Sequence, residues 1–159
     1  MSTKKKSTNI AILGLFTAII IVLQLMSYAI KIGNFNLSLV LIPIVLAAVL
    51  YGPKQSAFLG AVFGVVVTIA SIAGLDGGGF ILFSANPLLT TLICLAKGAL
   101  AGLFAGLIAQ PLKQKSPYLA VLVAAVVTPV TNTGLFVGGM FLCFRDILNE
   151  WAGGSDVVT

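Results

Sequence analysis

Residues 87–112, PLLTTLICLAKGALAGLFAGLIAQPL, decide the class of fold to which this chain belongs. The stretch exceeds the roughly 20 apolar residues that a helix needs to cross a membrane. Lys97 is its only charged residue, and glycine recurs every fourth residue from Gly98 to Gly106. A long apolar helix with a row of small residues is typical of a membrane span that packs closely against a neighbouring helix.

The composition of the whole chain agrees with this interpretation. Of its 159 residues, 59% are hydrophobic and 8% are charged, against roughly 25% charged residues in soluble domains. The chain cannot cover a water-facing surface, which excludes a cytosolic enzyme, a secreted disulfide scaffold and a disordered tail. It has no histidine and four acidic residues, so we expect no catalytic site, no metal and no cofactor.

Four further apolar runs predict an all-α, polytopic bundle with five membrane spans in a single domain. We expect the bundle over residues 9–145, between a basic segment at 1–8 and a polar tail at 146–159. Pro43 is expected to kink or unwind the second span, and the glycine triplet at 77–79 predicts a mobile loop. The five predicted spans are residues 9–30, 37–51, 56–75, 87–112 and 118–144.

The basic residues predict the orientation of the bundle. The net charge of +5 is explained by membrane orientation better than by nucleic acid, which we do not expect as a partner. Cytoplasmic loops carry an excess of lysine and arginine, which places the N-terminus inside the cell. On that side lie Lys4, Lys5, Lys6, Lys54, Lys113 and Lys115, against Lys31 and Arg145 on the other.

Small residues at helical spacing form rows on three of the predicted spans. The first span has Gly14 and Ala18, with Ala11 on a neighbouring part of the face, and the third span has the pair Gly60 and Gly64. Such rows allow close contact between helices, either inside the bundle or with another membrane protein. The spacing leaves both interpretations open.

Lys97 is the sharpest candidate for a binding residue. It lies ten residues beyond Pro87, about 15 Å along the helix and therefore near the middle of the membrane. We expect no acidic residue at that depth to neutralise it. Lys97 is either a cation that binds an anionic ligand, a side chain that reaches the interface, or a lysine that loses its charge.

Other polar residues are expected at similar depth or above it. Polar groups within spans usually face the bundle interior or a cavity, so we expect a cavity that opens to the outside. Asn132 binds either a ligand or a neighbouring helix, and Gln24 has the same two possibilities. The predicted set around Lys97 is Gln24, Thr128 and Asn132, with Asn86 at the mouth.

Several motifs occur in an order that resembles a known family. They are LSLVLIPIVL at 37–46, YGPK at 51–54, GAVFG at 60–64, KGALAG at 97–102 and TNTGLF at 131–136. Over about residues 9–145, the chain resembles the substrate-binding S components of energy-coupling factor (ECF) transporters.

The resemblance implies a non-enzymatic subunit in the plasma membrane of a prokaryote. It would capture a small water-soluble vitamin from outside, and Lys97 favours an anionic one such as pantothenate. The partners would be a transmembrane coupling protein and two cytoplasmic ATPases. The family's alanine-x-x-x-alanine contact on the first helix is matched in part, by Ala11, Gly14 and Ala18.

The resemblance also sets expectations for the loops and the helix number. The segments 31–36 and 74–86 would gate the mouth of the cavity. Six helices are usual in the family and this sequence supplies five, so we expect a C-terminally incomplete chain or a lost last helix. The alternative functions are a self-sufficient oligomeric secondary transporter or channel, and a membrane scaffold whose glycine rows only assemble partners.

Overall fold

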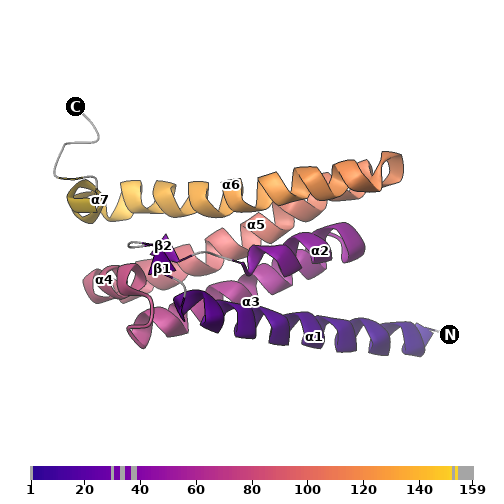
Figure 1. Ribbon diagram of the computed structural model, residues 1–159, viewed down its shortest axis with the longest axis horizontal. Coiled ribbons are helices and arrows are strands. Elements are labelled where there is room, and N and C mark those ends of the chain that lie inside the picture. Colours follow the sequence, from indigo (N-terminus) through magenta and orange to yellow (C-terminus); the bar gives the residue numbers. More distant parts are fainter. Residues whose placement is uncertain (1, 30, 33–34, 37–38, 152, 154–159) are drawn as a thin grey trace.

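The computed structural model describes residues 2–29, 31–32, 35–36, 39–151 and 153, and within them the chain is almost entirely helical (Figure 1). Two short strands, β1 (Lys31–Ile32) and β2 (Phe35–Asn36), pair antiparallel with Lys31 opposite Asn36. The helices are α1 (Ser2–Ala29), α2 (Leu41–Tyr51), α3 (Pro53–Ile72), α4 (Gly77–Ala85), α5 (Pro87–Lys115), α6 (Pro117–Cys143) and α7 (Arg145–Trp151).

Four of the described helices are long and apolar enough to cross a membrane, namely α1 over Ile10–Tyr28, and α3, α5 and α6 over their whole length. Helix α2 has eleven residues and rises about 16 Å, roughly half of the hydrocarbon thickness. Large apolar side chains such as Leu15, Leu88 and Leu142 are exposed, as expected on a surface that faces lipid. The predicted polytopic helical membrane bundle is confirmed, with four helices of spanning length among the described residues where we expected five, because the second apolar run forms only the short α2.

Proline and glycine affect the helices less than we predicted. Helix α2 begins at Leu41 and runs through Pro43 without interruption, because a proline in the first turn removes an N–H that has no helical partner. The predicted mobile loop at 77–79 was wrong, since Gly77 begins α4. There the N–H of Phe80 donates to the Asp76 carbonyl oxygen at 2.8 Å, and Leu82 is buried.

Helix α4 is not an additional span. It has nine residues and lies at the end of the bundle where α3 ends and α5 begins (Figure 1). The first turn of α4 needs glycine at position 79, because a Cβ atom on Gly79 would collide with the Ser71 side chain of α3. The helix therefore folds over the end of the bundle.

Helices α3 and α5 form the closest contact of the bundle through their glycine rows. A Cβ atom on Gly60 would collide with the carbonyl group of Gly98, and one on Gly64 would meet the carbonyl oxygen of Cys94. One turn further along, the Ser56 hydroxyl donates to the Gly102 carbonyl oxygen at 2.7 Å. The glycine rows on α3 and α5 therefore serve packing inside the bundle rather than contact with another membrane protein.

The remaining helices pack around this pair. Helix α1 packs mainly on α3, α6 lies along α5, and α2 contacts α3, α5 and α6. Gly52 ends α2 with φ 96°, a conformation that side chains other than glycine rarely adopt. The Gln110 amide then donates to the Ala48 carbonyl oxygen at 3.1 Å and satisfies the end of α2.

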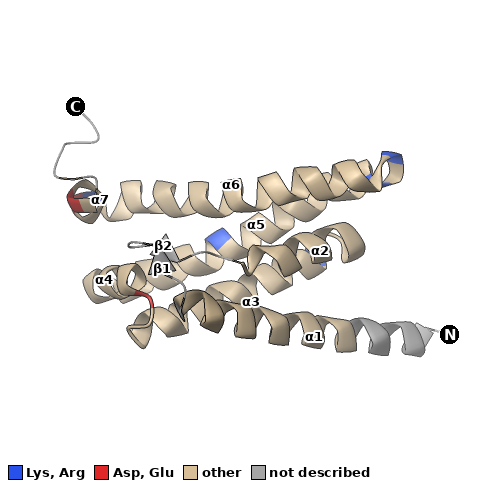
Figure 2. Ribbon diagram, viewed as in Figure 1, with Lys and Arg blue, Asp and Glu red and all other residues tan. Residues whose placement is uncertain are grey.

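Charge divides between the two ends of the bundle. Lys54 at the start of α3 and Lys113 and Lys115 at the end of α5 lie at the end that holds the N-terminus (Figure 2). The turn before α4 and helix α7 lie at the other end, and they carry Arg145 together with all the acidic residues of the described part of the chain. The side chains of Lys4, Lys5, Lys6 and Lys31 lie outside the described residues, so the orientation stays a prediction.

Candidate functional site

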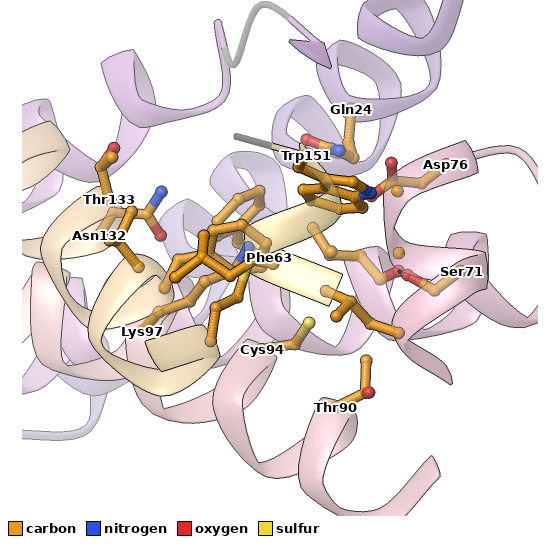
Figure 3. Close-up of a pocket in the computed structure, with 18 residues that line it drawn as sticks. Gln24, Phe63, Ser71, Asp76, Thr90, Cys94, Lys97, Asn132, Thr133 and Trp151 are labelled. Carbon is orange, nitrogen blue, oxygen red and sulfur yellow. Dashed lines mark hydrogen bonds between the residues drawn. The ribbon is translucent and has the colours of Figure 1, made fainter. Parts of the chain in front are cut away.

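A pocket of about 400 Å³ lies among α1, α3, α4, α5, α6 and α7 (Figure 3). Pockets for small ligands have volumes of roughly 300–1,000 Å³ and apolar walls with a few polar groups. Phe63, Val67, Phe136 and Met140 supply apolar wall here. The pocket lies toward the end of the bundle formed by α4 and α7, because its lining includes Asp76, Gly78 and Trp151.

Lys97 is half-buried and projects from α5 into this pocket. Its ammonium nitrogen lies 4.4 Å from the centroid of the Phe136 ring. A cation over an aromatic face gains about 0.5–2 kcal/mol, depending on how far it is desolvated. The contact holds the ammonium group within the pocket, where it can meet an anionic group of a ligand.

Two buried amides line the pocket, and each has an oxygen acceptor with no partner among the described residues. Gln24 on α1 is 3% exposed, and its Nε2 donates to the Tyr28 hydroxyl at 2.7 Å while its Oε1 is unpaired. Asn132 on α6 is 8% exposed, and its Oδ1 is also unpaired. Buried polar atoms are nearly always hydrogen-bonded, so such pairs of unpaired acceptors are uncommon.

Three of the predicted site residues come together here and two do not. Gln24, Lys97 and Asn132 line the pocket, whereas Thr128 and Asn86 do not. The Thr128 hydroxyl is fully buried and donates to the Ala124 carbonyl oxygen of its own helix at 2.7 Å. The Asn86 Oδ1 accepts from the Leu89 N–H at 3.2 Å and caps α5. Both side chains are thus engaged in local helix structure.

We expected no acidic residue at the depth of Lys97, and Asp76 does lie in the turn between α3 and α4, but from there it lines the pocket. Helix α3 ends at Ile72, earlier than the predicted span, and the following turn brings Asp76 over the cavity. The predicted gating segment 74–86 does border the pocket, through Asp76, α4 and its Leu82. In the other predicted gate, residues 33–34 lie outside the described part, and its role stays a prediction.

Sequence reasoning also missed Trp151, which lines the pocket from the region predicted as a polar tail. That region begins with α7, whose Ile147, Leu148 and Trp151 pack against the buried cluster of Leu82, Met140 and Phe144. The spacing of these three apolar residues along one helix face was the available signal. Residues 154–159 of the predicted tail lie outside the described residues.

The predicted docking face of α1 is open. Ala11, Gly14 and Ala18 are exposed, and nothing lies within 4 Å of a Cβ atom built on Gly14. Unlike the rows on α3 and α5, this one is not used by the described part of the bundle. It remains a prediction that a partner covers it.

A multi-pass helical membrane protein with one half-buried lysine and two unpaired amide oxygens in a pocket has the features of a binding subunit. A family model, "ECF transporter, substrate-specific component", matches residues 8–151. The chain belongs to this family of ECF transporter S components, which are substrate-binding components of transporters rather than enzymes. In general, they work with a membrane coupling protein and two ATPases.

A curated relative is the pantothenic acid transporter PanT of Lactococcus lactis subsp. cremoris (strain MG1363). It is 28% identical over 161 residues, which cover 94% of this chain and 80% of the relative. No solved structure matches the chain significantly.

Proposed function

We propose that this protein is the substrate-binding subunit of an ATP-driven uptake system in a bacterial plasma membrane, and that it binds pantothenate. The observation that carries the proposal is the Lys97 ammonium group held over Phe136 inside a pocket with apolar walls. The similarity to PanT, whose name gives pantothenic acid as its substrate, supports the choice of vitamin. The subunit itself performs no chemical step.

The charged and the apolar groups of pantothenate would each find a suitable partner in the pocket. Its carboxylate would pair with Lys97, and a charge-assisted hydrogen bond of this kind is about twice as strong as a neutral one. Its methyl-bearing centre would contact apolar wall residues such as Phe63 and Met140. Orientation by the basic residues at the N-terminal end would place the pocket in the outer half of the membrane, where it takes substrate from outside.

Uptake measurements test the proposed function. Cells that lack their own pantothenate uptake would express this protein with or without an ECF coupling module, and accumulation of radiolabelled pantothenate would be followed. We expect accumulation only with the module, and none when its ATPases carry an inactivating substitution. Accumulation without the module would instead support a self-sufficient transporter or channel. Absence of both uptake and binding would contradict the proposal and favour a scaffold.

The open face of α1 leads to a separate prediction about the partner. We expect Gly14→Leu to reduce co-purification with the coupling module by about tenfold or more, because a bulky side chain prevents close approach of two helices. Pantothenate affinity should stay within about twofold, since Gly14 does not line the pocket.

The matched control for Gly14→Leu is Gly138→Leu on α6. Gly138 is also exposed, and no described residue lies within 4 Å of a Cβ atom built on it, so both substitutions add the same side chain to an open helix face. Equal co-purification of Gly14→Leu and the unmodified protein would rule out this face as the docking surface.

A further inference from the structure

We propose that Gln24 and Asn132 determine substrate specificity as hydrogen-bond acceptors, so that the ligand is an anion that also carries hydroxyl or amide N–H donors. The inference rests on the proposed function, because it takes Lys97 as the group that binds the anion. The inference further assigns the protein atoms that select among carboxylates. The hydrogen bonds run from donors on the ligand to the amide oxygens of the protein.

The Asn132 carboxamide is the simpler of the two groups that need a hydrogen-bond donor from the ligand. Asn132 lines the pocket, and its buried Oδ1 has no hydrogen-bond partner in the part of the chain that the structure describes. An acceptor left without a partner in such surroundings costs about 1–3 kcal/mol. Of the neighbouring pocket residues on α6, Phe136 and Val137 have no side-chain donor, and the Thr133 hydroxyl makes no hydrogen bond to Asn132 Oδ1. A ligand that brings a donor removes this cost when it binds.

Gln24, on α1, also has an amide oxygen that needs a hydrogen-bond donor from the ligand. Its Nε2 donates to the Tyr28 hydroxyl at 2.7 Å, and its Oε1 has no partner among the residues that the structure describes. Tyr28 is therefore a positioning residue for the acceptor. Gln24 is also the one residue through which the described part of α1 lines the pocket.

The two acceptors lie on different sides of the pocket. Figure 3 shows Asn132 with Thr133 on one side and Gln24 with Trp151 and Asp76 on the other. A ligand with one donor group satisfies at most one of them, whereas a ligand with donors along its length satisfies both. Pantothenate, with hydroxyl groups at one end, an amide N–H in the middle and a carboxylate at the other end, has this distribution.

Binding of matched ligands to matched variants tests the inference. The probes are pantothenate and its analogue in which both hydroxyl groups are replaced by hydrogen, and Trp151, the chain's one tryptophan, reports binding by fluorescence. We expect the unmodified protein to bind the analogue about tenfold more weakly, since one acceptor loses its hydroxyl donor while the other can still accept from the amide N–H that the analogue retains. In the double variant Gln24→Leu/Asn132→Leu the two ligands should differ by less than about twofold.

The control is Thr128→Val, which changes a buried polar residue one turn before Asn132 whose hydroxyl is satisfied within the helix. It should retain the full discrimination between pantothenate and the analogue. Discrimination that is equal in the unmodified protein and in the double variant would overturn the inference.

A measurement without ligand keeps the inference testable if pantothenate does not bind, an outcome that contradicts the proposed function alone. Because Asn132 Oδ1 has no partner within the described ranges, Asn132→Leu should leave the Tm of the ligand-free protein unchanged or raise it by roughly a few degrees. A fall of about 5 °C or more would mean that the oxygen has a partner within the protein, and would overturn its assignment as an acceptor for the ligand.

Discussion

Lys97→Met is expected to weaken pantothenate binding by about 100-fold, equivalent to about 2.7 kcal/mol. Methionine keeps much of the length and apolar character of the lysine stem but leaves a ligand carboxylate without its cation in a partly desolvated pocket. Loss of one partner from such a pair typically costs about 2–5 kcal/mol. The affinity would be measured in detergent by titration of Trp151 fluorescence.

The matched control for this substitution is Lys115→Met. Lys115 is exposed in the last turn of α5, at the end of the bundle away from the pocket, and its loss should change the affinity by less than about twofold. The Tm of Lys97→Met should lie within roughly a few degrees of that of the unmodified protein, because the substitution removes a half-buried charge rather than a core side chain. An unchanged pantothenate affinity in Lys97→Met would remove Lys97 from the binding site.

The second large effect is expected for Gly60→Ala, which should lower the Tm by about 10 °C, equivalent to about 3 kcal/mol. A Cβ atom on Gly60 would stand 2.6 Å from the carbonyl carbon of Gly98, so the added methyl group meets backbone rather than a movable side chain. Helices α3 and α5 would have to separate, and the central contact of the bundle would be lost. Thermal unfolding in detergent measures the change.

Gly138→Ala provides the matched control for Gly60→Ala. Both glycines are inside membrane helices, but Gly138 is exposed and nothing lies within 4 Å of a Cβ atom there. Alanine is favoured over glycine within a helix by about 0.5–1 kcal/mol, so this variant should be as stable as the unmodified protein or slightly more. Equal destabilisation by both substitutions would contradict the account of the glycine row.

Much of the bundle follows from residue periodicity and hydropathy alone. The apolar runs located α1, α2, α3, α5 and α6, because a span has to be apolar over most of its length. The glycine rows on α3 and α5 indicated a close helix contact, although spacing could not show that these two helices pack on each other. The prediction that Gln24, Lys97 and Asn132 share one cavity agrees with their place in the pocket lining.

The parts that were not predictable depend on tertiary contacts at the end of the bundle. Helix α4 forms in spite of its three glycines because Leu82 is buried there and the small Gly79 fits against Ser71. Asp76 reaches the pocket through a turn whose course hydropathy does not specify. Depth estimates placed Thr128 near Lys97, but depth along a helix does not determine which direction a side chain faces.

The central claim is that the Lys97 ammonium group binds the carboxylate of pantothenate. Its most direct test adds a second ligand to the Lys97→Met titration: pantothenol, in which a hydroxymethyl group replaces the carboxylate. If Lys97 binds the carboxylate, the unmodified protein prefers pantothenate by about 100-fold, and Lys97→Met binds both ligands about equally. A preference for pantothenate that is the same in both proteins would contradict the claim.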